Sequence, residues 1–213
     1  TIINQGTYQV KNFLKILSKT AHAGIEPEKG MSAIKLAAEI LHQLPIGRID
    51  KETTNNIGVI KGGIADSVVP GDVILSGETR SLNKEKLETF ISKFQLIIED
   101  IQTKNPDVQF DFKSSEVYKG FYIKEDSVSV EIAKRACKNI GLKSSIKSIG
   151  AGSDANIFNQ NNIETIILGA GFKNSHSQNE YIMFSELIKL HKLMLNIVKE
   201  TSKQSINFEQ MIF

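Results

Sequence analysis

The sequence predicts an α+β domain followed by part of an α/β domain, and three observations support this. Over residues 7–118, β-prone segments and two amphipathic helical patterns occur in the order β-α-β-β-α-β, which is the order of ferredoxin-like domains. From residue 119 to 203, helical and strand patterns alternate, as is typical of an α/β layer. The length of 213 residues allows one large domain or two modest ones with a buried core.

The first part opens with a strand and a helix. Residues 8–17 are β-prone and largely apolar, and they are predicted to form a strand that ends near Ala21-His22-Ala23-Gly24. After a loop, Ile34, Ala37, Ala38 and Leu41 recur at helical spacing. Pro45-Ile46-Gly47 ends this helix.

The first part continues with two strands, a long helix and a last strand. Residues 53–60 and 73–80 are rich in β-branched residues and predict an antiparallel pair. Residues 84–103 carry their apolar side chains on one helical stripe, which Asn105-Pro106 terminates. Alternating Val108, Phe110 and Phe112 predict the last strand.

The second part has too few strands for an independent sheet. Its predicted elements are a helix over 128–139, a strand over 145–149, a short helix after Gly152-Ser153-Asp154, a strand over 165–168 and a helix over 185–199. Its two strands are expected to make a very small parallel sheet, and parallel strands normally need both faces covered. We therefore expect residues 119–203 to be part of a larger domain.

Composition excludes several classes of function. Lys and Arg number 26 against 24 Asp and Glu, and the net charge of +2 disfavours nucleic acid as the main partner. No apolar run approaches the roughly 18 residues that a membrane span requires. The single cysteine, Cys137, excludes an internal disulfide framework and favours a reducing, cytoplasmic setting. The chain starts at Thr1 with neither Met nor a signal-peptide pattern, so we expect a fragment.

Four histidines are candidates for chemistry. His42 and His191 lie on predicted helices, where surface or packing roles are the default. His176 follows a buried strand and a glycine-bearing loop, a place where α/β sheets hold ligands, and imidazole is a common metal ligand. Spacing alone leaves open whether His176 binds a metal, acts in catalysis or only donates hydrogen bonds. Glu180 is expected to orient this loop or cap the next helix.

The segment Gly150-Ala-Gly152-Ser153-Asp154-Ala-Asn156 also follows a strand and opens a helix. Its backbone N–H groups are able to hold an anion or a substrate carboxylate, although a plain Ser/Asp helix cap is the simpler interpretation. His22 and Arg80 stand at strand ends, and each is a weak signal by itself.

Together these segments resemble the peptidase T-like branch of the di-zinc metallopeptidases, which include aminopeptidases, carboxypeptidase G-type enzymes and aminoacylases. The resemblance covers about residues 7–200 and rests on motifs in order. These are Ala21-His-Ala-Gly-Ile-Glu-Pro-Glu-Lys-Gly30, Gly47-Arg-Ile-Asp-Lys-Glu-Thr-Thr-Asn-Asn-Ile-Gly58, Gly77-Glu-Thr-Arg80-Ser, Gly152-Ser-Asp-Ala-Asn156 and His176-Ser-Gln-Asn-Glu180-Tyr.

The resemblance implies an architecture and a set of roles. Residues 7–118 would be a ferredoxin-like lid through which the protein forms a homodimer, and residues 119–203 the C-terminal portion of a catalytic domain that binds two zinc ions and short peptides. His176 would ligate one zinc. His22 would stabilise the tetrahedral oxyanion, often in the partner subunit's site. The substrate contacts would come from Arg80, Gly152, Ser153, Asp154 and Asn156.

Two departures qualify this resemblance. Ser67 stands where the family commonly has an Asn before two apolar residues and Pro, which affects substrate contact. No segment supplies the family's H-x-D motif, bridging Asp or Glu-Glu pair. We therefore expect part of a di-zinc peptidase that is inactive as this chain. The alternative is a non-catalytic dimerisation or small-molecule-binding module of ferredoxin-like fold.

Overall fold

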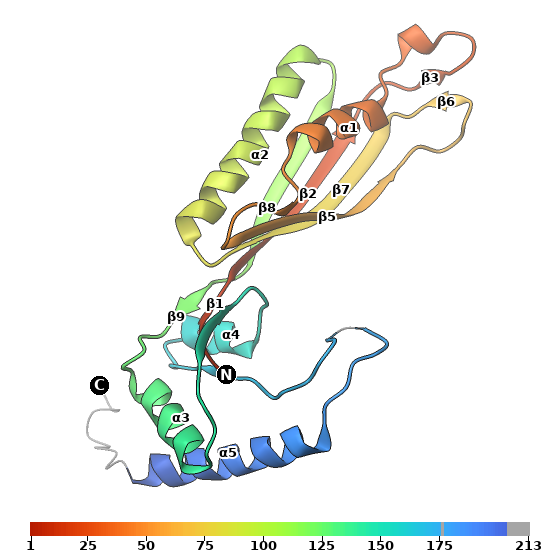
Figure 1. Cartoon of the computed structure of the whole chain (residues 1–213). Helices are drawn as coiled ribbons and strands as arrows, with labels where there is room; N and C mark the ends of the chain where they lie inside the picture. Colours follow the sequence, from red (N-terminus) through yellow and green to blue (C-terminus); the bar gives the residue numbers. More distant parts are fainter. Residues whose placement is uncertain (176, 204–213) are drawn as a thin grey trace. The chain divides into compact units, whose positions relative to one another are not determined.

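A computed structural model of the chain describes residues 1–175 and 177–203, which fall into two compact units (Figure 1). The central unit comprises residues 7–120 and 150–152. The terminal unit comprises residues 1–6 and 121–149 together with the described residues of 153–203. Three separate stretches of chain thus build the terminal unit.

The central unit contains a five-stranded antiparallel sheet in the order β4-β5-β7-β2-β8. Its strands are β2 (Tyr8–Leu17), β4 (Gly47–Arg48), β5 (Thr53–Gly62), β7 (Asp72–Ser81) and β8 (Gln109–Tyr118). The predicted antiparallel pairing of residues 53–60 with 73–80 is confirmed, because β5 pairs with β7.

A short arm extends from one end of this sheet (Figure 1). It comprises residues 19–31 and 63–71, in which β3 (Ala21–His22) pairs with β6 (Val68–Val69) beside a 3₁₀ turn at Pro27–Lys29. We call it the β3–β6 arm. The sequence did not predict this small pair, because two residues are too few to show a period.

Two helices, α1 (Ala33–Gln43) and α2 (Lys84–Lys104), cover one face of the sheet (Figure 1). At their starts, Ser32 Oγ accepts a hydrogen bond from the Lys35 N–H at 3.3 Å and Asn83 Oδ1 accepts one from the Lys86 N–H at 3.1 Å. These two side chains satisfy N–H groups that the first helical turn leaves without a backbone partner. The start of α2 at Lys84 agrees with the predicted helix over 84–103.

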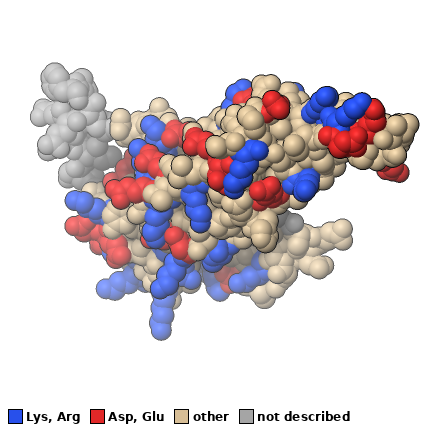
Figure 2. Space-filling view, turned by 90° about the horizontal axis from the view of Figure 1, so that it is seen from above, with Lys and Arg blue, Asp and Glu red and all other residues tan. Residues whose placement is uncertain are grey.

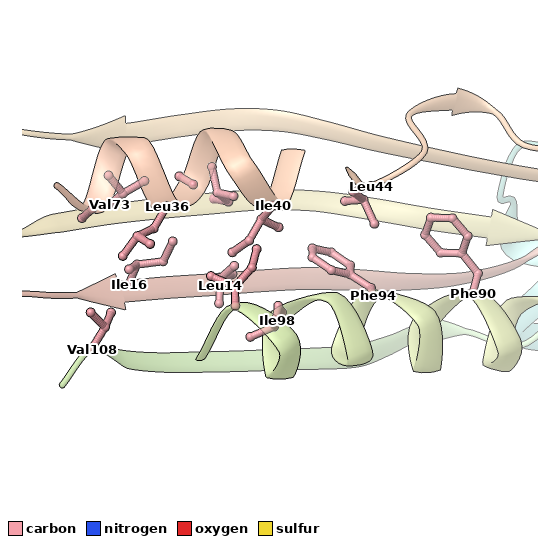
Figure 3. Packing of buried hydrophobic residues seen from close by; sticks show 14 residues of the cluster. Leu14, Ile16, Leu36, Ile40, Leu44, Val73, Phe90, Phe94, Ile98 and Val108 are labelled. Atoms are coloured by element: carbon pink, nitrogen blue, oxygen red, sulfur yellow. The ribbon is translucent and has the colours of Figure 1, made fainter. Parts of the chain in front are cut away.

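The core of the central unit lies between these helices and the sheet (Figure 3). Its members include Leu14, Ile16, Leu36, Ile40, Val73, Leu75, Phe90, Phe94 and Ile98. Alternate residues of β2 and β7 face it, as the period of a strand requires. The Phe94 and Phe112 rings are tilted, with centroids 4.7 Å apart.

The terminal unit holds a small mixed sheet. β1 (Ile2–Gly6) runs parallel to β10 (Ile146–Ile149) and antiparallel to β11 (Ile167–Leu168) and β9 (Phe121–Tyr122). The expectation of a small parallel sheet is wrong here, because the two predicted strands do not pair with each other. The unpredicted β1 lies between them.

The helices of the terminal unit are α3 (Val128–Asn139), α4 (Asp154–Gln160) and α5 (Phe184–Ser202). α3 packs on α5, where Glu200 is 5% exposed and accepts hydrogen bonds from Asn139 (2.9 Å) and Arg135 (3.2 Å). Hydrogen bonds from Lys203 and Asn139 hold the pKa of Glu200 below its usual value. Among the helices that the structure describes, none is both long and apolar enough to span a bilayer.

Candidate functional site

Arg80 lies on the open face of the central sheet, opposite the helices. Its neighbours Thr79 and Ser81 are fully buried on the helix-covered face, so Arg80 points the other way. Its Nε and Nη2 donate to the two carboxylate oxygens of Glu78 at 2.8 and 3.0 Å. This two-point contact fixes the plane of the guanidinium.

Two further side chains lie in the same row of the sheet. Gln9 pairs with Arg80 on one side and with Tyr118 on the other, and Gln9 Nε2 donates to Glu78. Burial by itself lowers the pKa of Arg80, but the hydrogen bonds to Glu78 raise it above its usual value. Arg80 is therefore a fixed positive charge that is suited to a carboxylate.

The segment Gly150–Gly152 belongs to the central unit and packs against this row. Arg80 Nη1 donates to the Gly150 carbonyl at 3.3 Å. A Cβ added at Gly152 would lie 2.4 Å from the end of the Tyr118 ring, so any larger residue there requires the Tyr118 side chain or the segment to shift. The structure thus brings together Arg80 and Gly152, two residues that the sequence singled out separately.

Gly152→Ala is expected to displace the segment 150–152 from Tyr118 and to cost about 1–3 kcal/mol, because overpacking a filled space is destabilising. Amide hydrogen exchange over residues 146–154 measures it, with faster exchange expected in the variant. Gly150→Ala is the matched control, since a Cβ there meets nothing within 4 Å. Equal exchange in both variants would contradict the proposed contact.

Tyr118 is a site residue that sequence reasoning missed. Burial raises its pKa, and its hydroxyl is buried with no hydrogen-bond partner among the described residues. Glu78 and Gln9 were missed as well. Glu78 lies inside the quoted Gly77–Ser81 motif, whereas Gln9 and Tyr118 could be found only from the strand register.

Ser153, Asp154 and Asn156 open α4 in the terminal unit. Asn156 is 1% exposed, and its side-chain oxygen accepts the Ser153 N–H at 3.0 Å, while Asp154 is exposed. These contacts fit the helix-cap interpretation, because the Ser153 N–H is already used. Their role toward a substrate stays a prediction.

His22 lies on the β3–β6 arm with its side chain exposed. The Ala23 N–H donates to the Ser67 carbonyl at 2.8 Å, and the Gly24 N–H donates to His22 Nδ1 at 3.2 Å. Since Nδ1 accepts, a neutral ring carries its proton on Nε2. His22 therefore presents an N–H donor to its surroundings.

The structure does not bring His22 next to Arg80 within one chain. His22 pairs with Val68 of β6, and β6 comes just before the start of β7 in the chain. Arg80 lies near the opposite end of β7. At about 3.3 Å per strand residue, the eight steps from Asp72 to Arg80 correspond to roughly 25 Å. Within one chain, His22 and Arg80 are therefore too far apart to act together on the same peptide bond of a short substrate.

His176 lies outside the described residues. The segment around it is closed by a pair of backbone hydrogen bonds between Lys173 and Tyr181, of 2.8 and 3.2 Å. The expected helix cap at Glu180 is wrong, because α5 begins at Phe184 with Met183 as its N-cap. Within residues 1–175 and 177–203, no group of three His, Cys, Asp or Glu residues is placed to hold a metal ion.

Comparisons with known proteins give a consistent result. Residues 7–106 match the family model described as the peptidase dimerisation domain, of the M20 type. The chain is 38% identical to the crystal structure of aminopeptidase PepT from Bacillus cereus ATCC 10987 (TM-score 0.84) and 32% identical to that of a tripeptidase from Staphylococcus aureus Mu50 (TM-score 0.89). Each match covers 95% of this chain and 54% of the other.

The match to a curated relative covers the same shares of the two chains. The chain is 37% identical over 202 residues to the uncharacterized protein YqjE of Bacillus subtilis strain 168, which covers 95% of this chain and 54% of YqjE. The chain thus spans about half the length of the proteins that it matches.

Proposed function

We propose that the protein containing this chain is an M20-type, zinc-dependent exopeptidase of short peptides, because residues 7–106 match the M20 peptidase dimerisation domain. The observation that carries this proposal is the similarity over 95% of the chain to an aminopeptidase and a tripeptidase. The whole reaction is proposed for the longer protein, since this chain spans about half of each relative.

We propose that residues 7–118 are the ferredoxin-like lid and that residues 119–203 are the C-terminal portion of the catalytic domain. The order β5-β7-β2-β8 with both helices on one face supports the first assignment. The second is supported by the mixed sheet of the terminal unit, which also takes in residues 1–6.

The described residues do not fit a complete zinc site. A catalytic zinc takes about three protein ligands, and the described part of the chain offers no such group. We propose that His176 supplies one ligand and that residues outside this chain supply the others. Zinc, when bound, polarises a carbonyl and acidifies water.

The residues of this chain have separate tasks in the proposal. Arg80, held flat by Glu78, binds a carboxylate of the peptide, and the segment Gly152–Asn156 contacts the peptide backbone. His22 donates its Nε2 hydrogen to the oxygen of the scissile carbonyl as negative charge develops there, which stabilises the transition state. Because His22 lies far from Arg80 in one chain, the partner copy supplies it.

We also propose that nucleic acid is not a partner and that the protein acts in the cytoplasm. Figure 2 supports the first statement, because acidic and basic side chains are interspersed over the face that it shows. The single, buried Cys137 supports a reducing compartment.

The test compares the complete gene product with the 213-residue chain on a panel of di- and tripeptides, with zinc per chain measured in both. We expect hydrolysis by the complete protein and its loss on chelation, and no hydrolysis by the chain alone. Absence of hydrolysis by the zinc-loaded complete protein would refute the proposal. Rapid hydrolysis by the isolated chain would refute the division of the site.

A further inference from the structure

A cavity of about 430 Å³ opens on the helix-covered side of the central unit. It lies between the segment of residues 45–53, which leads from α1 into β5, and the first half of α2. Thr53 lines the cavity and is buried on the helix-covered face, whereas Arg80 points to the open face of the sheet. The cavity is therefore separate from the Arg80 row, and its volume is within the range of small-ligand sites.

The inner wall of the cavity is apolar and held in place by the core. Pro45, Ile49 and Phe90 line it. Phe90 is a core residue that is 6% exposed, and Ile49 packs against the same core. Because close-packed side chains have little room to rearrange, this wall offers a fixed surface to an apolar group.

One side of the cavity carries charges that are already paired. The Lys86 ammonium contacts the carboxylates of Glu52 at 2.6 Å and Asp50 at 3.5 Å. Asp50 Oδ1 also accepts the backbone N–H groups of Glu52 and Thr53 at 2.7 and 2.8 Å, and the first of these hydrogen bonds holds the pKa of Asp50 below its usual value. These contacts tie the segment 45–53 to α2 and leave a ligand little to pair with on this side.

Three polar side chains on the α2 wall are unused. Glu85, Thr89 and Lys93 line the cavity and are exposed, and their side chains form no ion pair or hydrogen bond within the described part of the chain. They are four residues apart along α2, so they share one face of the helix. At 1.5 Å per residue, Glu85 and Lys93 are about 12 Å apart, with Thr89 midway. The wall thus presents an anion, a hydroxyl and a cation in a row.

We propose that this cavity binds a short zwitterionic peptide with an apolar side chain, extended along α2. The peptide's amino group pairs with Glu85, a peptide carbonyl accepts the Thr89 hydroxyl hydrogen, and its carboxylate pairs with Lys93. An extended chain spans about 3.3–3.6 Å per residue, so a tripeptide of roughly 10 Å matches this spacing. The cavity is lined by two acidic and two basic side chains, which favours a ligand without net charge.

The cavity has a direct connection to the strand that carries Arg80. Thr53 lines the cavity, and its Oγ1 lies 2.9 Å from the Oγ of Ser81, the residue next to Arg80. A peptide bound here is of the same class as the proposed substrate. A role of the cavity in sensing substrate or product rests on the proposed function, whereas the binding itself rests on the cavity alone.

The test is a titration of the 213-residue chain with the peptide Ala-Leu-Ala in the presence of a metal chelator, followed by calorimetry and by NMR of the backbone amides. We expect saturable shifts over residues 45–53 and 85–93. Lys93→Gln and Glu85→Gln should each weaken binding about threefold, as is usual for the loss of one exposed ion pair. Lys84→Gln is the matched control, because Lys84 is exposed on the same helix and does not line the cavity.

A blocked peptide and a further variant separate this site from the Arg80 row. Acetyl-Ala-Leu-Ala lacks the amino-terminal charge, so it should bind more weakly and be insensitive to Glu85→Gln. Arg80→Ala should leave the shifts over 45–53 and 85–93 unchanged. Absence of these shifts at millimolar peptide, their loss in Arg80→Ala, or equal affinity of Lys93→Gln and Lys84→Gln would overturn the proposal. Because no hydrolysis is measured, such a failure is separate from a failure of the proposed activity.

Discussion

Replacing Phe94 by alanine is expected to destabilise the central unit by about 3–5 kcal/mol, the range measured for removing a buried aromatic side chain. Phe94 is 1% exposed and packs between the two helices and the sheet, with its ring next to that of Phe112 (Figure 3). Its removal leaves a cavity that α1 and α2 cannot close without losing their own contacts with the strands.

Urea unfolding followed by far-ultraviolet circular dichroism measures this effect, since the chain contains no tryptophan. Leu96→Ala is the matched control on the same helix, because Leu96 is 64% exposed and its change should stay within about 0.5 kcal/mol. Similar midpoints for the two variants would show that the α2 stripe does not form the core.

His22→Ala in the complete, zinc-loaded protein is expected to lower kcat by about 10²–10³, the usual cost of removing one oxyanion donor. Zinc per chain should stay the same, because His22 lies on the β3–β6 arm and donates rather than ligates. A kcat within threefold of the wild type, measured on a tripeptide, would count against this role.

Mixing variants tests whether His22 acts in the partner's site. Copies carrying His22→Ala and copies carrying Arg80→Ala should each be nearly inactive alone. In hybrid dimers, one site contains the intact Arg80 of one copy and the intact His22 of the other. Random exchange should therefore restore about one quarter of wild-type activity. No recovery after verified subunit exchange would show that both residues act within one chain.

The sequence by itself determined the elements with strong local periods. The apolar stripe of α2 and the alternation of Val108, Phe110 and Phe112 each predict an element that the structure contains. These signals arise within a few neighbouring residues, where side-chain periods of 3.6 and 2 decide which face is buried. Motif order likewise indicated a peptidase T-like protein, and the comparisons agree: residues 7–106 match the M20 peptidase dimerisation domain, and the chain is 38% identical to an aminopeptidase PepT.

Only the tertiary structure decided which distant segments meet. β1 was not predicted because five residues show little period, and its strand is specified by pairing with β10 and β11 at the other end of the chain. Gly152 was singled out for its loop, and only the structure shows that the Tyr118 ring packs where a Cβ of residue 152 would lie. The separation of His22 from Arg80 follows from the length of β7, since the β3–β6 arm joins one end of this strand and Arg80 lies near the other. Contacts of this kind depend on long-range packing, which no local pattern in the sequence records.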